Sequence, residues 1–129
     1  MIEINNLTSF AVDKKFFIRV AKKVLKGENR EGENISIAFV SSAEIKKLNR
    51  KYRKKNKSTD VLSFSKIPGL KSDLAEVIIC PEVVRKNGDE LAKILIHGIL
   101  HILGYDHEKS KKKAMQMEEK EKHYLLMII

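Results

Sequence analysis

Hydrophobic and polar positions repeat with two different periods along the chain, and the two periods predict its strands and helices. Four segments have the two-residue alternation or short apolar run of a β-strand; they are 2–8, 35–40, 59–65 and 74–80. The last of these is the most apolar, so it is predicted to be central in its sheet. Segments with a period near 3.6 predict helices; these begin near Asp13, Ser41, Pro81, Asn87 or Asp89, and Ser110.

Capping residues support these helix starts. Asp13 is a typical N-cap residue, and Ser41 followed by Glu44 has the pattern of a capping box. The buried face of the helix after Ser41 is predicted to contain Ile45, Leu48 and Tyr52. The order of the elements predicts an α/β or α+β fold in a single domain, 1–129, with a mixed four-stranded sheet and four to five helices.

The composition narrows the class of protein. The 129 residues include 26 Lys and Arg against 17 Asp and Glu, a net charge of +9, which favours an anionic partner. Nucleic acid is the leading candidate and an acidic membrane surface the second, while a basic surface that serves solubility is the alternative. The first residues lack the pattern of a signal peptide, and no apolar stretch approaches the ~20 residues of a membrane span. A cytoplasmic protein without a membrane segment is therefore expected, and its single cysteine, Cys80, is expected to be buried.

Basic residues are densest between Lys46 and Lys57. Eight of these twelve residues are basic and none is acidic; the eight are Lys46, Lys47, Arg50, Lys51, Arg53, Lys54, Lys55 and Lys57. Such a run is typical either of a solvated helix face or of a surface that binds nucleic-acid phosphates. We predict that these eight residues contact the phosphates of a nucleic acid.

Three of the four histidines have the spacing of a metal site. On a helix, His97 and His101 would lie about 40° apart on one face, so both imidazoles could bind one ion. Gly104 offers a left-handed residue that would end the helix and return His107 to the same ion. Three protein ligands with an open fourth position are typical of a catalytic Zn²⁺, one per chain, although imidazoles also suit other divalent ions. The alternative is a purely structural role for all three histidines.

The same spacing occurs in zinc peptidases, with one important difference. Those enzymes have a glutamate after the first histidine, and it acts as the general base. Gly98 occupies that position here and has no side chain that could accept a proton. A peptidase is therefore the least favoured function.

The chain resembles the YbeY family of bacterial rRNA-maturation factors and metal-dependent endoribonucleases. Three segments carry the resemblance: 97–107 with its three histidines, 48–64, and 77–80 before a short helix. The resemblance implies that His97, His101 and His107 bind Zn²⁺ and that Arg53 lines the cleft near the metal. It also implies single-stranded RNA as the substrate, with maturation of the 3′ end of 16S rRNA and ribosome quality control as the roles. The small ribosomal subunit and its associated factors are the implied partners.

Some positions depart from the family pattern. Ala75-Glu76 replaces the usual Gly-Asp, Ser65 replaces a proline, and the segment before the histidine helix is short. Asp106 is interpreted either as a hydrogen-bond partner of a metal ligand or as a capping aspartate. His123 is expected to be an exposed helix residue.

Two questions about function stay open in the sequence. The general base would be a hydroxide on the metal, Glu76, or the 2′-hydroxyl of the substrate. The alternative to an endoribonuclease is a ribosome-biogenesis factor that binds RNA and carries a structural metal.

Overall fold

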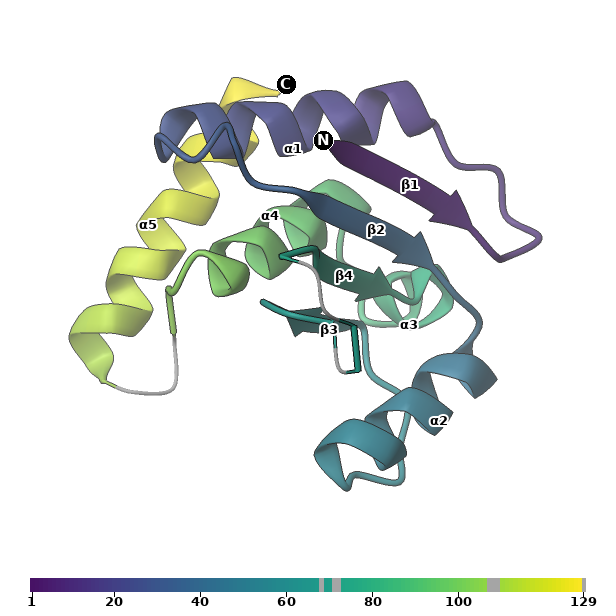
Figure 1. Cartoon of the computed structure of the whole chain (residues 1–129). Helices are drawn as coiled ribbons and strands as arrows, with labels where there is room; N and C mark the ends of the chain where they lie inside the picture. The colour runs from purple at the N-terminus through teal and green to yellow at the C-terminus, as the bar shows by residue number, and fades with distance from the viewer. Residues whose placement is uncertain (68, 71–72, 107–109, 129) are drawn as a thin grey trace.

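The computed structural model describes residues 1–67, 69–70, 73–106 and 110–128 (Figure 1). Its strands are β1 (Ile2–Asn6), β2 (Ile35–Phe39), β3 (Val61–Phe64) and β4 (Ala75–Ile79). Its helices are α1 (Lys14–Gly27), α2 (Ser42–Arg53), α3 (Pro81–Lys86), α4 (Leu91–Ile102) and α5 (Lys111–Met127). The described part of the chain thus has the α/β fold with four strands and five helices that the sequence predicts.

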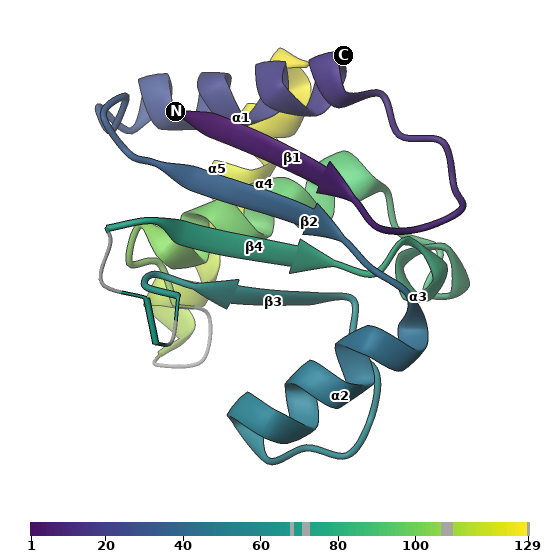
Figure 2. The same ribbon diagram turned by 45° about the vertical axis from the view of Figure 1, so that its right-hand side comes forward.

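The four strands form one mixed sheet in the order β1-β2-β4-β3. The first three in that order are parallel, and β3 runs antiparallel to β4 at the lower edge of the sheet in Figure 2. The prediction that segment 74–80 is a central strand is confirmed, because β4 pairs with β2 on one side and β3 on the other.

Alternating side chains of the sheet build two apolar clusters on its two faces. On one face, residues such as Ile37 and Val77 pack against α1, α4 and α5. On the other face, Ala38, Leu62 and Ile78 form a smaller cluster with the first half of α2. Figure 1 shows α4 behind the sheet, α1 along one end and α2 at the opposite end.

Helix α4 lies unusually close to the sheet because of Gly98. A Cβ atom at this position would stand 2.7 Å from Cγ1 of Val77 and 3.1 Å from Oγ of Ser63. The Ser63 hydroxyl donates a hydrogen bond of 3.1 Å to the carbonyl oxygen of Gly98. A glycine is therefore required where the helix crosses β3 and β4.

The N-caps of three helices are confirmed. Asp13 and Ser41 accept hydrogen bonds from the backbone N–H groups three residues later, as does Ser110 at the start of α5. Pro81 is the first residue of α3, where its missing N–H has no cost.

The predicted N-cap of α4 at Asn87 or Asp89 is wrong. Residues 87–89 end the preceding helix instead: Gly88 has a φ of +75°, and the N–H of Asp89 donates to the carbonyl oxygen of Val84. The N-cap of α4 is Glu90, whose side chain makes no capping hydrogen bond. Only the four residues 87–90 connect the two helices, and the first three of them close the end of α3.

The prediction that Tyr52 is buried is also wrong, since Tyr52 is 39% exposed. Only Ile45 and Asn49 of α2 are buried. The last turn of α2 extends beyond edge strand β3 (Figure 2). The ring of Tyr52 contacts Phe64 of that strand, at 5.5 Å between ring centroids, and Nζ of Lys51 lies 5.1 Å from the Tyr52 centroid.

We expect Gly98→Ala to destabilise the protein. The added methyl group must displace the side chain of a buried, β-branched valine, and overpacking of this kind costs about 1–3 kcal/mol, of which better helix propensity returns about 1 kcal/mol. Urea unfolding would measure the change. The matched control is Gly32→Ala, because a Cβ atom at Gly32 meets nothing within 4 Å. Equal stability of the two variants would contradict the tight packing of α4.

Candidate active-site cleft

Two imidazoles of α4 share one wall of a cleft of about 670 Å³. The rings of His97 and His101 are one helical turn apart, with 4.8 Å between their centroids and 75° between their planes. Edge strand β3 and the segment 55–60 form other parts of the wall. The i,i+4 spacing thus brings two imidazole side chains, a type of group that binds Zn²⁺ in proteins, to one side of the cleft.

The chain turns after α4 as the sequence predicts. Gly104 has a φ of +105°, and the N–H of Tyr105 donates to the carbonyl oxygen of Leu100, which closes the end of the helix. Asp106 then lines the cleft. His107, the third predicted ligand, lies outside the described residues, and within those residues no three His, Cys, Asp or Glu side chains are grouped for a metal.

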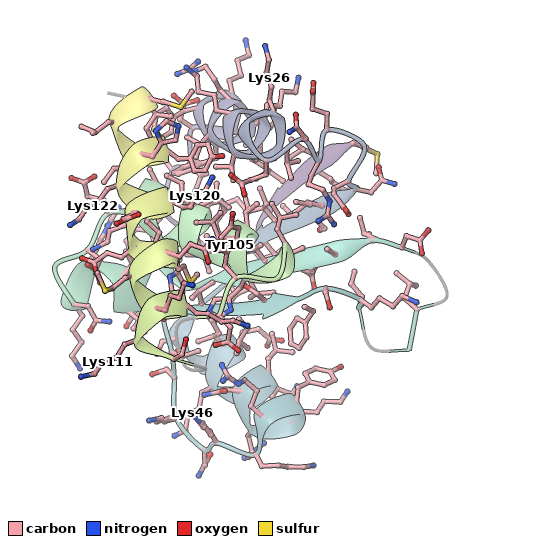
Figure 3. The ribbon with its side chains drawn as sticks, turned by 90° about the vertical axis from the view of Figure 1, so that its left-hand side faces the viewer. Lys26, Lys46, Tyr105, Lys111, Lys120 and Lys122 are labelled. Atoms are coloured by element: carbon pink, nitrogen blue, oxygen red, sulfur yellow. The ribbon has the colours of Figure 1, made fainter. Side chains whose placement is uncertain are left out.

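The basic run divides into two parts. Arg53, Lys55 and Lys57 line the cleft with the histidines. The other five residues do not line it and are exposed on α2 or at its C-terminus; they are Lys46, Lys47, Arg50, Lys51 and Lys54. Figure 3 shows Lys46 at the end of the molecule opposite Lys26 of α1.

A buried amide shapes the loop that carries these cations. Lys54 takes a left-handed conformation with a φ of +60° and ends α2. The side chain of Asn49, which is 2% exposed, then donates a hydrogen bond of 2.9 Å to the carbonyl oxygen of Lys57. Sequence reasoning missed this role of Asn49, because the loop that it binds is eight residues away.

Glu76 does not belong to the cleft. Its neighbour Val77 faces α4, so Glu76 points to the opposite face of the sheet. There it accepts a hydrogen bond of 3.3 Å from Ser36, and burial raises the pKa of its carboxyl group. Glu76, one of the three candidates for the general base, therefore does not line the cleft. Among the described residues, Asp60 and Asp106 supply the carboxylates that line the cleft.

The position that carries the peptidase base is directed at the sheet. A side chain at Gly98 would enter the space of Val77 and Ser63. A glutamate there could not be placed without separating α4 from the sheet. The structure thus gives a packing reason for the glycine that the sequence shows.

Sequence reasoning also missed Glu121 of α5. Its Oε1 atom forms a hydrogen bond with Nδ1 of His97. The acidic residue is 24 positions from the histidine and belongs to no motif. The available signal was its spacing from Met117 and Tyr124, which places it on the buried face of α5.

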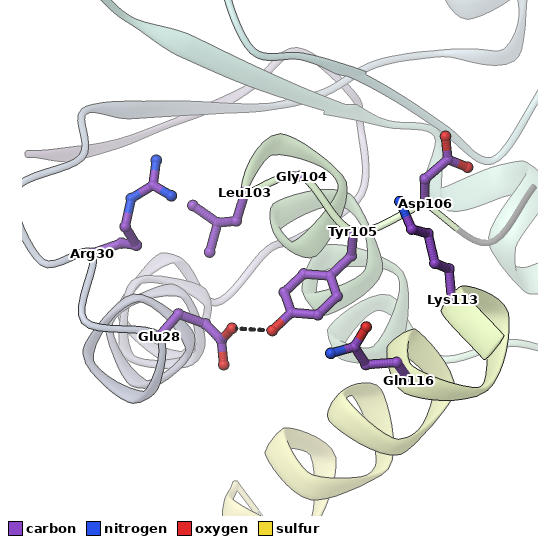
Figure 4. A pocket seen from close by; sticks show the side chains of 8 residues that line it. All are labelled: Glu28, Arg30, Leu103, Gly104, Tyr105, Asp106, Lys113 and Gln116. Atoms are coloured by element: carbon purple, nitrogen blue, oxygen red, sulfur yellow. Dashed lines mark hydrogen bonds between the residues drawn. The ribbon is translucent and has the colours of Figure 1, made fainter. Parts of the chain in front are cut away.

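A second carboxylate, Glu28, holds the segment after α4 in place (Figure 4). The hydroxyl of Tyr105 donates a hydrogen bond of 2.6 Å to Glu28, Lys120 Nζ lies 3.2 Å away, and Tyr124 donates a third hydrogen bond. The Glu28 side chain is only 9% exposed. Burial alone would raise its pKa, but the three donors outweigh burial and lower it.

Fold and site together define a class: an α/β protein whose cleft combines a histidine pair with a row of cations beside an antiparallel edge strand. The family model described as "Endoribonuclease YbeY" matches residues 3–128. The chain therefore belongs to the endoribonuclease YbeY family.

Individual relatives agree with this assignment. An "Endoribonuclease YbeY" of Bdellovibrio bacteriovorus is 41% identical over 74% of this chain and 67% of its own length. One of Persephonella marina is 39% identical over 83% of this chain and 78% of its own. The solution structure of TM1509 from Thermotoga maritima has a TM-score of 0.64 and 31% identity, and the match covers 99% of this chain and 89% of that one.

No described helix is long and apolar enough to cross a membrane.

We expect Tyr124→Phe to lower the free energy of unfolding by about 2 kcal/mol at pH 7, because it removes one hydrogen bond to a largely buried carboxylate. The pH dependence follows from two pKa shifts. The pKa of Glu28 is lowered from 4.5, so its contribution is present above that pH and is lost as the pH falls through the folded-state value. The pKa of Tyr124 is raised above 10.0, so its contribution is lost only as the pH rises beyond that value.

The matched control for this prediction is Tyr52→Phe, which removes a hydroxyl group that forms no hydrogen bond within the described part of the chain. We expect it to change stability by less than about 0.5 kcal/mol. Urea unfolding of both variants between pH 3 and pH 9 would measure the difference. A Tyr124→Phe loss that stays constant down to pH 3 would contradict the role of the Glu28 carboxylate.

Proposed function

We propose that this protein is a zinc-dependent, single-strand-specific endoribonuclease that acts on rRNA. One observation carries the proposal: two imidazoles and three permanent or near-permanent cations, Arg53, Lys55 and Lys57, line the same cleft. That combination suits a substrate with a polyanionic backbone and a reaction at a phosphodiester. The names of the relatives support the same reaction class.

His97, His101 and His107 are the residues that would hold the metal. The first two fit this role because they present imidazole nitrogens one helical turn apart on one wall of the cleft. When bound, Zn²⁺ supplies Lewis-acid chemistry that assists phosphodiester cleavage. The side chains of the protein would bind and orient the substrate around that centre.

Arg53 would neutralise the charge that develops on the phosphate. Its guanidinium is planar and permanently charged, so it can bind two phosphate oxygens at once. Lys55 and Lys57 would hold neighbouring phosphates without reading the base sequence. Phe64, which also lines the cleft, offers an aromatic ring for an unpaired base, which favours a single strand over a duplex.

The biological role that we propose is maturation of the 3′ end of 16S rRNA and ribosome quality control in the cytoplasm, with the small ribosomal subunit and associated factors as partners. Support comes from membership of the family and from the excess of basic residues. A ribosome-biogenesis factor that binds RNA and carries a structural metal is the second candidate. It is favoured by the five basic residues of the run that lie outside the cleft.

We expect His101→Ala to reduce cleavage of a labelled single-stranded RNA by at least about 100-fold, because the loss of a Lewis acid costs several kcal/mol of transition-state stabilisation. The matched control is His123→Ala, which removes an exposed imidazole of α5. Both variants would be purified in parallel with the wild type, and their zinc content measured. Equal cleavage by all three proteins, or cleavage by none of them, would contradict the proposed nuclease activity. If none of them cleaves RNA but all of them bind it, the result favours the RNA-binding factor.

Replacement of the two cleft lysines by glutamine should weaken RNA binding and its salt dependence. For a single strand, each lost phosphate contact lowers the slope of log K against log salt by about 0.7, so Lys55→Gln with Lys57→Gln should lower it by about 1.4. The matched control is Lys22→Gln with Lys26→Gln on α1. Figure 3 shows Lys26 of this helix at the far end of the molecule. Fluorescence anisotropy at several salt concentrations measures both slopes. Equal losses in the two double variants would show that only net charge matters.

A further inference from the structure

The C-terminal helix reaches the histidine pair through one carboxylate. Oε1 of Glu121 forms a hydrogen bond with Nδ1 of His97, and the two side chains are 14% and 25% exposed. A carboxylate that is so little exposed needs a partner, because burial of an unpaired charge is costly. The contact is thus a specific feature of the packing of α5 on α4.

The position of Glu121 on α5 follows from its apolar neighbours. Met117 and Tyr124, four residues before and three after, are each 1% exposed and turn the same face toward the core. Glu118 and Glu119 lie on the outer face and are exposed. Among these three acidic residues, only Glu121 is directed at α4.

The choice of ring nitrogen matters for a metal site. A carboxylate that accepts a hydrogen bond from Nδ1–H fixes the neutral tautomer in which Nε2 carries a lone pair. It also fixes the orientation of the ring and increases the basicity of the ligand. His97 would then coordinate a metal through Nε2.

We propose that Glu121 is a positioning residue of the active site: it holds His97 as the Nδ1–H tautomer, with Nε2 directed to the metal. This inference rests on the proposed function, because it requires that His97 binds a metal. The competing interpretation is that the contact only joins α5 to α4. In that case its loss would change stability but neither the tautomer nor the affinity for metal.

The experiment compares Glu121→Ala, Glu121→Gln, Glu119→Ala and His101→Ala with the wild type. Zinc affinity would be measured by competition with a chromophoric chelator. Loss of a carboxylate that orients a ligand weakens metal binding by about 10- to 100-fold, which is the change expected for Glu121→Ala. Glu121→Gln keeps an acceptor oxygen without the charge, so its affinity should lie between those of the alanine variant and the wild type. Glu119→Ala, on the outer face of α5, should bind zinc as the wild type does.

A second measurement is independent of the metal. In the metal-free protein, ¹⁵N chemical shifts of the imidazole nitrogens report the tautomer of His97. We expect the Nδ1–H form in the wild type and in Glu119→Ala, and a shift toward the Nε2–H form in Glu121→Ala. If Glu121→Ala fails to fold, zinc affinity and the tautomer of His97 are both measured on Glu121→Gln instead.

The outcomes separate this inference from the proposed function. If His101→Ala weakens zinc binding but neither Glu121 variant changes affinity or tautomer, the positioning role is overturned and the metal site stands. If His101→Ala binds zinc as tightly as the wild type, the metal site itself fails. A tautomer change in Glu121→Ala with unchanged zinc affinity also overturns the positioning role, since the contact would then have no effect on the metal.

Discussion

The contact of Gly98 with the sheet sets the distance between α4 and the edge strand, and the cleft depends on that distance. With no side chain at this position, the helix backbone comes close enough for Ser63 to donate a hydrogen bond to its carbonyl oxygen. The preceding residue, His97, is thereby held beside β3, where the wall of the cleft is formed. The glycine that deprives the chain of a peptidase base is the same glycine that brings helix and strand together. Its structural role and its consequence for function have one physical cause.

Two largely buried carboxylates hold α4 and the residues after it in place. Glu121 contacts His97 at one end, and Glu28 holds Tyr105 near the other. Helix α5 takes part in both contacts, since it supplies Glu121 itself and the donors Lys120 and Tyr124 to Glu28. Each carboxylate is paired with side chains of the chain itself, and such hydrogen-bonded support makes a site rigid.

The sequence correctly predicted the features that depend on neighbouring residues, but not those that depend on contacts between separate elements. The strands, the N-caps at Asp13 and Ser41, and the two imidazoles on one side of α4 each follow from a pattern a few residues long. Glu76 stayed among the candidates for the general base for another reason. The face of the sheet that a strand residue occupies is decided only when the sheet packs against α4. Tyr52 was predicted to be buried because helix periodicity does not show where a sheet ends. The contact of Glu121 with His97 was not predicted, because the two residues belong to different helices.

The basic run shows that a continuous stretch of charge in a sequence is not one surface in space. Lys46, Lys47, Arg50 and Lys51 are exposed on α2. The left-handed conformation of Lys54 then turns the chain so that Lys55 and Lys57 line the cleft. In the proposed function, a strand bound at the cleft would continue along the exposed side of α2. The lysines of the helix would then lengthen the contact with phosphates without approaching the reacting bond. The lysines of α2 would therefore contribute to RNA affinity alone, whereas Arg53 in the cleft would also affect the rate of cleavage.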